Sequence, residues 1–356
     1  MEEFLIKFFV TGIIFSLTVP SIFFVLFKQR ILPDKEIFLY SLGIGPVLTS
    51  LLLYYLLLIF PHKSNLFYFL SVLGFFGFLS VFSLIYLKTR KEQIREFFLK
   101  FKNDLFKKKK IAKNILLFIV ITFSLILTIM YLKGYVSRPL FGHDALVYGV
   151  EGKIYYAEKS LDAKFSGYYP KTGFDYFSLH APAFPLVLTW EKILNNYLNT
   201  NSDYYFKSMS PYYGFLILLT TFLLLKKKNI YLAIFSVIAL LSGLTFFLSF
   251  NIYHIDTFRI YFLMLSWLFL GYAVEKKDIF SITMFGIFTG FASFIHSIGA
   301  IIAGFNCLGF LIFADFKWLY RLKYLSFVVF LTIIFGWFHY IIDIFYGQGW
   351  IFHGGL

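Results

Sequence analysis

The sequence predicts an all-α polytopic membrane protein with about ten transmembrane helices and further helices at the extracytoplasmic membrane surface. Two observations lead to this fold class. Of the 356 residues, 59% are hydrophobic and only 15% are charged, whereas a soluble domain carries about 25% charged residues. Several apolar runs also approach the roughly 20 residues that a helix needs to cross a bilayer. The surplus of apolar side chains is therefore expected to face lipid.

The first run contains Lys7 and has no small-residue cleavage site, so we expect a helix there and not a removable signal peptide. Residues 184–198 carry Glu191 and Lys192, which favours a helix lying in the membrane interface over a span. If this segment spans instead, the later loops exchange sides. The candidate spans are the runs 4–27, 37–60, 66–87, 115–132, 209–225, 230–250, 258–274, 279–296, 298–314 and 324–345.

The orientation follows from the basic loops, because loops rich in Lys and Arg tend to remain cytoplasmic. Segment 88–113 holds eleven Lys and Arg against three acids, and we expect it to be a cytoplasmic loop on anionic lipid headgroups. The net charge of +14 is then mainly a topology signal, because no nucleic-acid-binding module is recognisable. The segments that fall on the same side are 28–36, 226–228, 275–278 and 315–323.

The opposite, outer face is expected to hold both termini and the long polar loop 133–183. The 251–259 turn, with the sequence NIYHIDTFR, and the hairpin at His296 join them there. Ionisable residues near the membrane are costly and are functional candidates by default. The sequence therefore predicts a site at the outer membrane boundary.

The first part of the polar loop has helical periodicity. Asp144, Tyr148, Glu151 and Tyr155 are spaced by four, three and four residues, which places them on one helix face. Asp144 would lie in the first turn, where the helix dipole favours an ionised carboxylate. Such a carboxylate can act as a general base towards a hydroxyl. The alternative is that Asp144 only caps the helix.

Two histidines are placed by rigid or tight local structure. His180 begins the stretch HAPAFP, in which Pro182 and Pro185 hold the chain extended. It could contact an acceptor or a phosphate, although an ordinary membrane-entry turn has the same composition. His296 separates two apolar runs and is expected at a hairpin tip. A hydrogen-bonded histidine buried between helices is the alternative.

The turn 251–259 brings together His254, Asp256 and Arg259. A guanidinium is well suited to a lipid-linked phosphate, and the alternative is an intrahelical ion pair between Asp256 and Arg259. His339 and Asp343 lie four residues apart near the last outer boundary, and we assemble no metal site from them. Cys307 is the single cysteine, which excludes an internal disulfide and a cysteine-based metal site.

These motifs resemble a known family. FGHDALVYGVEGKIYYAEKSL is similar to the first extracytoplasmic loop of GT-C glycosyltransferases of the protein mannosyltransferase and aminoarabinose transferase type, where an acidic residue precedes a Tyr and a short helix. Four later stretches resemble further motifs of these enzymes in the same order: HAPAFPLVLTW, HIDTFRIYFLML, GIFTGFASFIHSIGAI and GWFHYIIDIFYGQGWIFHGG. The resemblance covers about 115 to 356.

The resemblance implies a GT-C-like module at 114–356 with a catalytic loop at 133–183, preceded by a three-helix extension at 1–87 and the basic loop. It implies an inverting transfer of a sugar from a polyprenyl-phosphate donor to an acceptor hydroxyl on a lipid, glycan or protein. The reaction would take place at the outer membrane face. We expect a bacterial or archaeal plasma membrane, and the endoplasmic reticulum is the alternative. Because family members commonly continue further, we expect a compact variant or an incomplete chain.

The resemblance also assigns roles. Asp144 would be the general base, and the donor phosphate and substrate would be bound by residues of the same outer face: Arg259, His254, Asp256, His296, His180, His143, Tyr148 and Glu151. Ala145 stands where many members carry a second acid, so we assign no metal ligands and leave a divalent metal open. His296 replaces the usual Lys or Arg, and Ala181 interrupts the paired prolines.

Other function classes stay open. An O-antigen-type polymerase or ligase would also have a large outer loop but would typically place arginines there, and this loop offers only Arg138. A transporter or flippase for a lipid-linked sugar predicts repeated halves with broken helices, and no internal repeat is visible. A non-catalytic assembly subunit with a decayed site is the third alternative.

Overall fold

In the computed structural model, the chain is described for residues 6–18, 40–105, 143–175, 181–243 and 255–346, and for positions 115, 118, 119, 122 and 126. Within these ranges all regular secondary structure is helical, apart from an isolated bridge between Tyr169 and Phe174. The predicted all-α fold is confirmed for this part of the chain. The elements are η1 (Phe8–Ile14), α4 (Ile44–Ile59), α5 (Asn65–Leu105), α7 (His143–Glu158), α8 (Asp162–Ser166), α9 (Ala183–Leu198), α10 (Tyr204–Lys207), α11 (Met209–Lys226), α12 (Ile230–Ser242), α14 (Asp256–Lys276), α15 (Ile279–Ile295), α16 (Ser297–Phe313), α17 (Trp318–Thr332), η4 (Ile333–Trp337) and α18 (Phe338–Phe345), where η denotes a π-helix.

Four helical stretches are long and apolar enough to cross a membrane, namely Asn65–Ile85, Tyr204–Lys226, Asp256–Lys276 and Trp318–Phe345. Five apolar helices are shorter: Phe9–Thr18, Ile44–Ile59, Ile230–Ser242, Ile279–Ile295 and Ser297–Phe313. Large apolar side chains are exposed on the outer surfaces of several of them, including Phe78, Phe235 and Phe305. Apolar surface of this extent suits a lipid environment.

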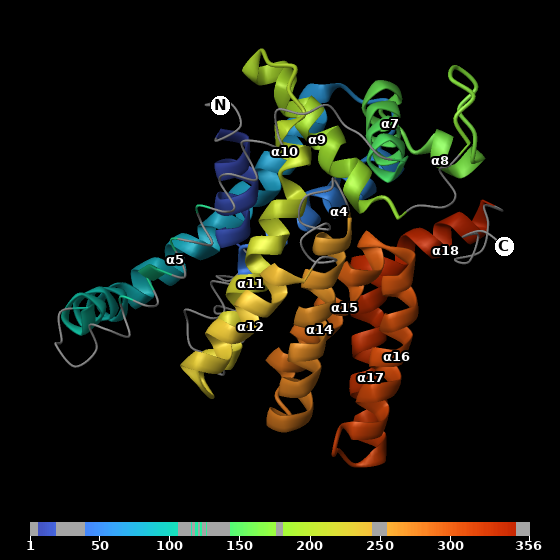
Figure 1. Ribbon diagram of the computed structural model, residues 1–356. Coiled ribbons are helices and arrows are strands. Elements are labelled where there is room, and N and C mark those ends of the chain that lie inside the picture. The colour runs from blue at the N-terminus through green and yellow to red at the C-terminus, as the bar shows by residue number, and fades with distance from the viewer. Residues whose placement is uncertain are drawn as a thin grey trace.

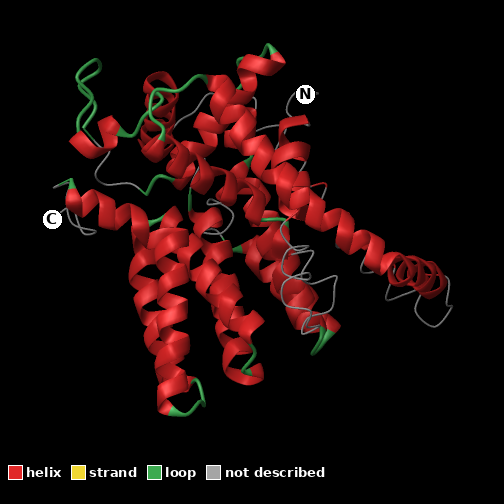
Figure 2. Cartoon of the chain, turned by 180° about the vertical axis from the view of Figure 1, so that it is seen from behind, coloured by secondary structure: helices red, strands yellow, loops and turns green. Residues whose placement is uncertain are grey.

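Figure 1 shows two ends of a helical bundle. Helices α7 to α10 gather at one end, and the connections that follow α14 and α16 lie at the other. An ion pair of 2.6 Å between Lys277 and Asp315 joins these two connections. Helix α11 runs parallel to α14. Thr257 donates a 2.8 Å hydrogen bond to the Ser210 carbonyl near both starts, and Thr221 contacts Met264 at 3.9 Å further along both helices. The basic residues that end α11 and α14 therefore lie at the end away from α7. The view from behind shows the same two ends (Figure 2).

Residues 88–105 correct one prediction. We expected 88–113 to be a loop, but helix α5 continues without a break from Asn65 to Leu105. The reason is local, since the sequence contains no Gly or Pro from 78 to 105 and is rich in Lys, Arg, Glu and Leu. These residues have high helix propensity, and adding a residue to an existing helix is far easier than nucleating a new one.

Helix α15 is the centre of the bundle. Every residue from Phe280 to Ile295 is buried, and its neighbours are α14, α16, α17 and η4. Close approach to η4 depends on small residues, because a Cβ added to Gly336 would lie 2.0 Å from the Gly290 carbonyl oxygen. Small residues are the usual means by which apolar helices approach closely in membranes.

Helix α9 is the predicted 184–198 helix, and its surroundings differ from the prediction. An interfacial helix would keep one face exposed, but every residue from Ala183 to Glu191 is buried. The surrounding elements are α4, α5, α7, α10 and α15. Trp190 also donates a hydrogen bond of 3.1 Å to Thr11 in the first helical segment. Helix α9 is thus packed inside the protein over most of its length and does not lie on its surface.

Helices α7 and α9 lie side by side and run parallel. Near the start of the pair, the rings of Tyr148 and Phe184 are 5.4 Å apart. In the middle, Thr189 donates a hydrogen bond of 3.0 Å to the Gly152 carbonyl, and near the end Tyr156 donates one of 2.9 Å to Asn196. The first turn of α7 is therefore held near the first turn of α9.

Replacement of Gly152 by alanine tests this packing. A Cβ at Gly152 would lie 2.5 Å from the Pro185 carbonyl oxygen and 3.0 Å from the Leu188 Cβ, so α7 must move away from α9. Overpacking of this kind costs about 1–3 kcal/mol. We expect Gly152→Ala to lower the unfolding temperature of the purified protein in detergent. Gly304→Ala is the control, because a Cβ there meets no atom within 4 Å; equal effects of the two changes would contradict the packing.

Candidate functional site

The predicted acidic face of α7 is buried. Tyr148, Glu151 and Tyr155 all lie in the interior, which confirms that they share one face. Asp144 is the second residue of α7 and His143 the first, so Asp144 lies in the first turn as predicted. The side chains of these two residues lie outside the described part of the structure.

The start of α14 approaches the starts of α7 and α9. Phe184 contacts Tyr148 on one side and Phe258 on the other, with centroid distances of 5.4 and 6.3 Å. Phe258 is the neighbour of Arg259, which forms an ion pair with Asp256. The amino-terminal parts of three helices therefore converge around Phe184, and the amino terminus of a helix carries partial positive charge.

Arg259 and Asp256 make the intrahelical pair that was one of the two interpretations of this motif. The pair does not remove Arg259 from the surface, because the two side chains retain 18% and 22% of their exposure. His254 and His180 lie outside the described residues. They directly precede Ile255 and Ala181, at the starts of the segments that lead into α14 and α9.

His296 is at the tip of the α15–α16 hairpin, as predicted. Its Nδ1 accepts a hydrogen bond of 3.1 Å from the Ile298 amide, so the side chain caps α16. Gly299 packs tightly against the end of α15, where an added Cβ would lie 1.9 Å from the Ala292 carbonyl oxygen. The cap requires Nδ1 without a proton and leaves Nε2 as the ring's other polar atom.

A second group of polar residues lies beneath α7, and we call it the inner polar cluster: Tyr54, Glu151, Tyr155, Lys164, His339 and Asp343. Lys164 and Asp343 form a buried ion pair of 2.9 Å between α8 and α18. His339 contacts the Gly336 carbonyl at 2.6 Å, and its ring lies 6.3 Å from that of Tyr54.

Tyr155 connects this cluster to the face of α7. Burial raises the pKa of its hydroxyl well above the usual value, and the neighbouring Glu151, Asp343 and Tyr54 raise it further. Among the described residues, Tyr54 Oη, His339 Nε2 and Asp343 Oδ1 are buried without a hydrogen-bond partner. Buried polar atoms of this kind are costly unless a water or ligand satisfies them.

The spacing of His339 and Asp343 in the sequence gives no connection with Lys164 or Glu151. The spacing of four residues between His339 and Asp343 was the only local feature of the sequence that indicated a polar cluster. A buried carboxylate needs a cation, yet nothing in the sequence identifies Lys164, 179 positions away, as that cation.

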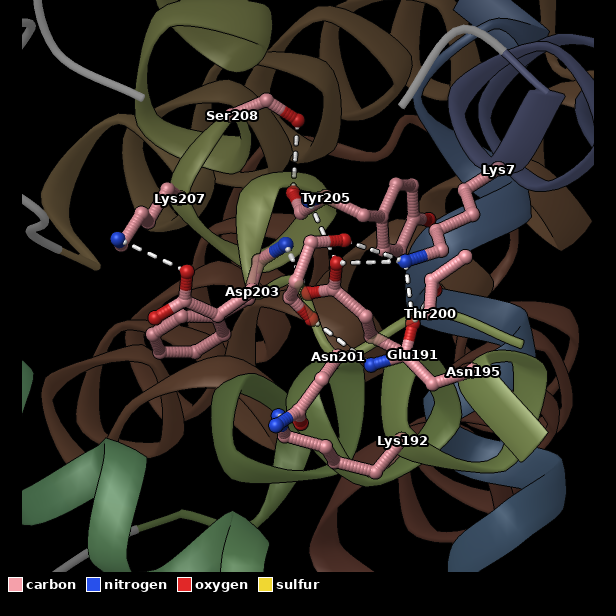
Figure 3. Close-up of polar contacts among 12 residues, drawn as sticks. Lys7, Glu191, Lys192, Asn195, Thr200, Asn201, Asp203, Tyr205, Lys207 and Ser208 are labelled. Carbon is pink, nitrogen blue, oxygen red and sulfur yellow. Dashed lines mark hydrogen bonds and ion pairs between the residues drawn. The ribbon is translucent and has the colours of Figure 1, made fainter. Parts of the chain in front are cut away.

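A third polar group joins the first helical segment to α9 and α10 (Figure 3). Lys7 and Glu191 are both fully buried, with 3.4 Å between Lys7 Nζ and Glu191 Oε1. Lys7 also donates to Asn195 and, at 2.7 Å, to Ser202. The amides of Tyr205 and Phe206 each donate a 2.9 Å hydrogen bond to the Glu191 carboxylate.

Burial dominates the charge state of Glu191. It raises the pKa of the carboxyl group to about 7, although Lys7 and the two amide donors act in the opposite direction. The ion pair is thus fully formed only above neutral pH. Because the contacts fix the first segment, α9 and α10 relative to one another, this network has a structural role.

Among the described residues, no group of three His, Cys, Asp or Glu side chains is arranged to hold a metal ion. No known family model, curated protein or solved structure matches the chain. The functional assignment therefore depends on the motifs and on the geometry of these three polar groups.

A double-mutant cycle on Lys7 and Glu191 tests the third group. Removing one partner of a buried ion pair costs about 3–5 kcal/mol, because the other charge stays buried and unpaired, whereas replacing both is far less harmful. We expect Lys7→Met to lower the unfolding free energy at pH 8 by this amount, and Lys7→Met with Glu191→Gln to recover most of it. The coupling would be contradicted if the double variant lost as much unfolding free energy, in thermal or denaturant unfolding, as the two single variants together. The exposed pair Lys277 and Asp315 is the control, for which a coupling below about 1 kcal/mol is expected.

Proposed function

We propose that the protein is a GT-C-like glycosyltransferase that moves a sugar from a polyprenyl-phosphate donor to an acceptor hydroxyl at the outer face of the membrane. The observation that supports this most strongly is the convergence of the α7, α9 and α14 amino termini. The first carries Asp144 and the last carries Arg259. The same convergence brings together three of the five stretches on which the resemblance rests.

The converging termini suit the donor phosphate. Helix amino termini present free amide donors and favour anions, and a guanidinium binds phosphate through two parallel hydrogen bonds. In the proposed complex, Arg259 turns from Asp256 towards the phosphate. The exposed apolar surface of the bundle lets the lipid tail reach this point from the bilayer.

Asp144 supplies the base. In an inverting displacement, the acceptor oxygen attacks the anomeric carbon while the bond from that carbon to the phosphate oxygen breaks. The hydroxyl proton passes to the Asp144 carboxylate, and polyprenyl phosphate leaves with the bonding electrons. The amide groups and Arg259 stabilise the negative charge that develops on the phosphate, as preorganised donors do at other developing anions.

The inner polar cluster would position α7 for this reaction. The Lys164–Asp343 pair ties α8, which follows α7 in the chain, to α18. The same cluster contains the buried oxygen and nitrogen atoms of Tyr54, His339 and Asp343 that have no hydrogen-bond partner among the described residues. In this proposal they hold α7 through bound water or a substrate hydroxyl and take no part in proton transfer.

One observation favours transport instead. Buried ion pairs within a membrane helix mark many substrate and proton pathways, and Asp343 lies in the apolar stretch Trp318–Phe345. Reconstituted vesicles separate the two functions. Unaltered donor that moves across the bilayer would favour a transporter, and donor that loses its sugar to an acceptor would favour the transferase.

Asp144→Asn tests the base. General bases contribute about 10²–10⁴-fold to rate, so we expect a loss of this size in sugar transfer from a radiolabelled polyprenyl-phosphate donor. Asp175→Asn is the matched control, because Asp175 is an exposed acid in the same polar loop. Undiminished turnover in Asp144→Asn would exclude Asp144 as the base.

Arg259→Gln tests the phosphate contact. Loss of hydrogen bonds to a charged group costs about 1.5–3 kcal/mol, so we expect kcat/KM for the donor to fall about tenfold or more. The kcat/KM of Arg259→Lys should lie between the values of the wild type and Arg259→Gln, since an ammonium keeps the charge but not the bidentate geometry. Lys228→Gln, in an exposed turn at the other end of the bundle, is the control. An Arg259→Gln enzyme with wild-type kcat/KM would show that the phosphate binds elsewhere.

A further inference from the structure

The end of the α7–α9 pair opposite Asp144 carries an open pocket of about 470 Å³. Its lining residues come from α7, α9 and the connection to α10: Lys153, Tyr156, Lys192, Asn201 and Asp203. Lys153 lies nine residues after Asp144, or about 13 Å along a helix. The pocket is therefore separate from the proposed point of sugar transfer. Its volume is in the range of small-molecule sites.

The charge of this pocket is not balanced by its own residues. Asp203 is the single acid in the lining, and it already forms an ion pair of 2.8 Å with Lys207. Figure 3 shows this pair and the neighbouring Lys192, which donates a hydrogen bond of 3.3 Å to Asn201. Glu191, next in sequence, is occupied by Lys7 and by two backbone amides.

The two lysines of the pocket lack carboxylate partners within the described residues. Lys153 is exposed and forms no ion pair there. Lys192 is half-buried, and burial lowers the pKa of its ammonium group; Glu191 and Asp203 oppose this shift, whereas Lys153 adds to it. Two neighbouring ammonium groups repel each other, and a bound anion would relieve that repulsion.

We propose that this pocket binds a phosphate group carried on a polar, hydroxyl-bearing head, as in a sugar phosphate or a glycerophospholipid. Lys153 and Lys192 would contact the phosphate oxygens. The Asn201 amide would bond to a hydroxyl, and the ring of Tyr156 would pack against the head. An ammonium is a point-charge ligand for phosphate and needs no fixed fork geometry. The proposal does not depend on glycosyl transfer.

Titration of glucose 6-phosphate into the full chain in phosphatidylcholine nanodiscs tests this site by calorimetry. We expect saturable binding at one site that weakens at least about tenfold in Lys153→Ala/Lys192→Ala, because hydrogen bonds to charged groups of this kind are lost. Lys317→Ala/Lys323→Ala removes the same charge from exposed positions at the other end of the bundle, and it should bind as the wild type does. Asp144→Asn should bind glucose 6-phosphate as the wild type does. Binding in this pocket can therefore be judged whether or not Asp144 proves to be the base for sugar transfer.

A second arm identifies the source of the phosphate. Native mass spectrometry of protein from nanodiscs containing phosphatidylglycerol shows whether one anionic lipid is retained, and whether it is lost in Lys153→Ala/Lys192→Ala. Site-dependent binding in either arm supports the pocket and assigns its occupant as a soluble or a lipid-borne phosphate. The proposal is overturned if neither probe binds saturably, or if the pocket variant and the control variant bind both probes equally. Unchanged unfolding temperatures of both variants confirm that they are folded.

Discussion

The parallel packing of α7 along α9 is the constraint on which the candidate site depends. Helix α7 buries a face that includes Tyr148 and Tyr155. Its register on α9 is set by close contact at Gly152 and by hydrogen bonds that involve Thr189 and Asn196. Since both helices point the same way, their amino termini meet beside the start of α14. A rotation or shift of α7 would separate the residue proposed as the base from the residue proposed to hold the phosphate.

Buried charges keep this arrangement in register. The Lys7–Glu191 pair fixes α9 to the first helical segment, and the Lys164–Asp343 pair fixes α8 to α18. Desolvation offsets much of the attraction in each pair, so their contribution to net stability is modest. We infer that their main effect is on specificity, because any other register leaves a charge in an apolar interior without a partner. The group of helices α7 to α10 is thus held to the rest of the protein by two separate ion pairs.

Local features of the sequence predicted much of this structure. Hydropathy located the apolar helices, and spacings of three and four residues identified the buried face of α7 and the Asp256–Arg259 pair. The hairpin between α15 and α16 was predicted because His296 interrupts an apolar run. Long-range pairing had no comparable signal, since Lys7 and Glu191 are 184 positions apart and neither position shows its partner. The length of α5 was missed because charge density was taken as a sign of a loop, whereas Lys and Glu also favour helices.

The most direct test of the account is photo-crosslinking with a polyprenyl phosphate that carries a diazirine next to the phosphate, followed by peptide mapping. We expect labelled peptides from the starts of α7, α9 and α14, and competition by the unmodified lipid phosphate. Labelling confined to the basic connections at the other end of the bundle, around Lys228, Lys277 and Lys317, would contradict it. In that case the converging helix starts would not be the donor site.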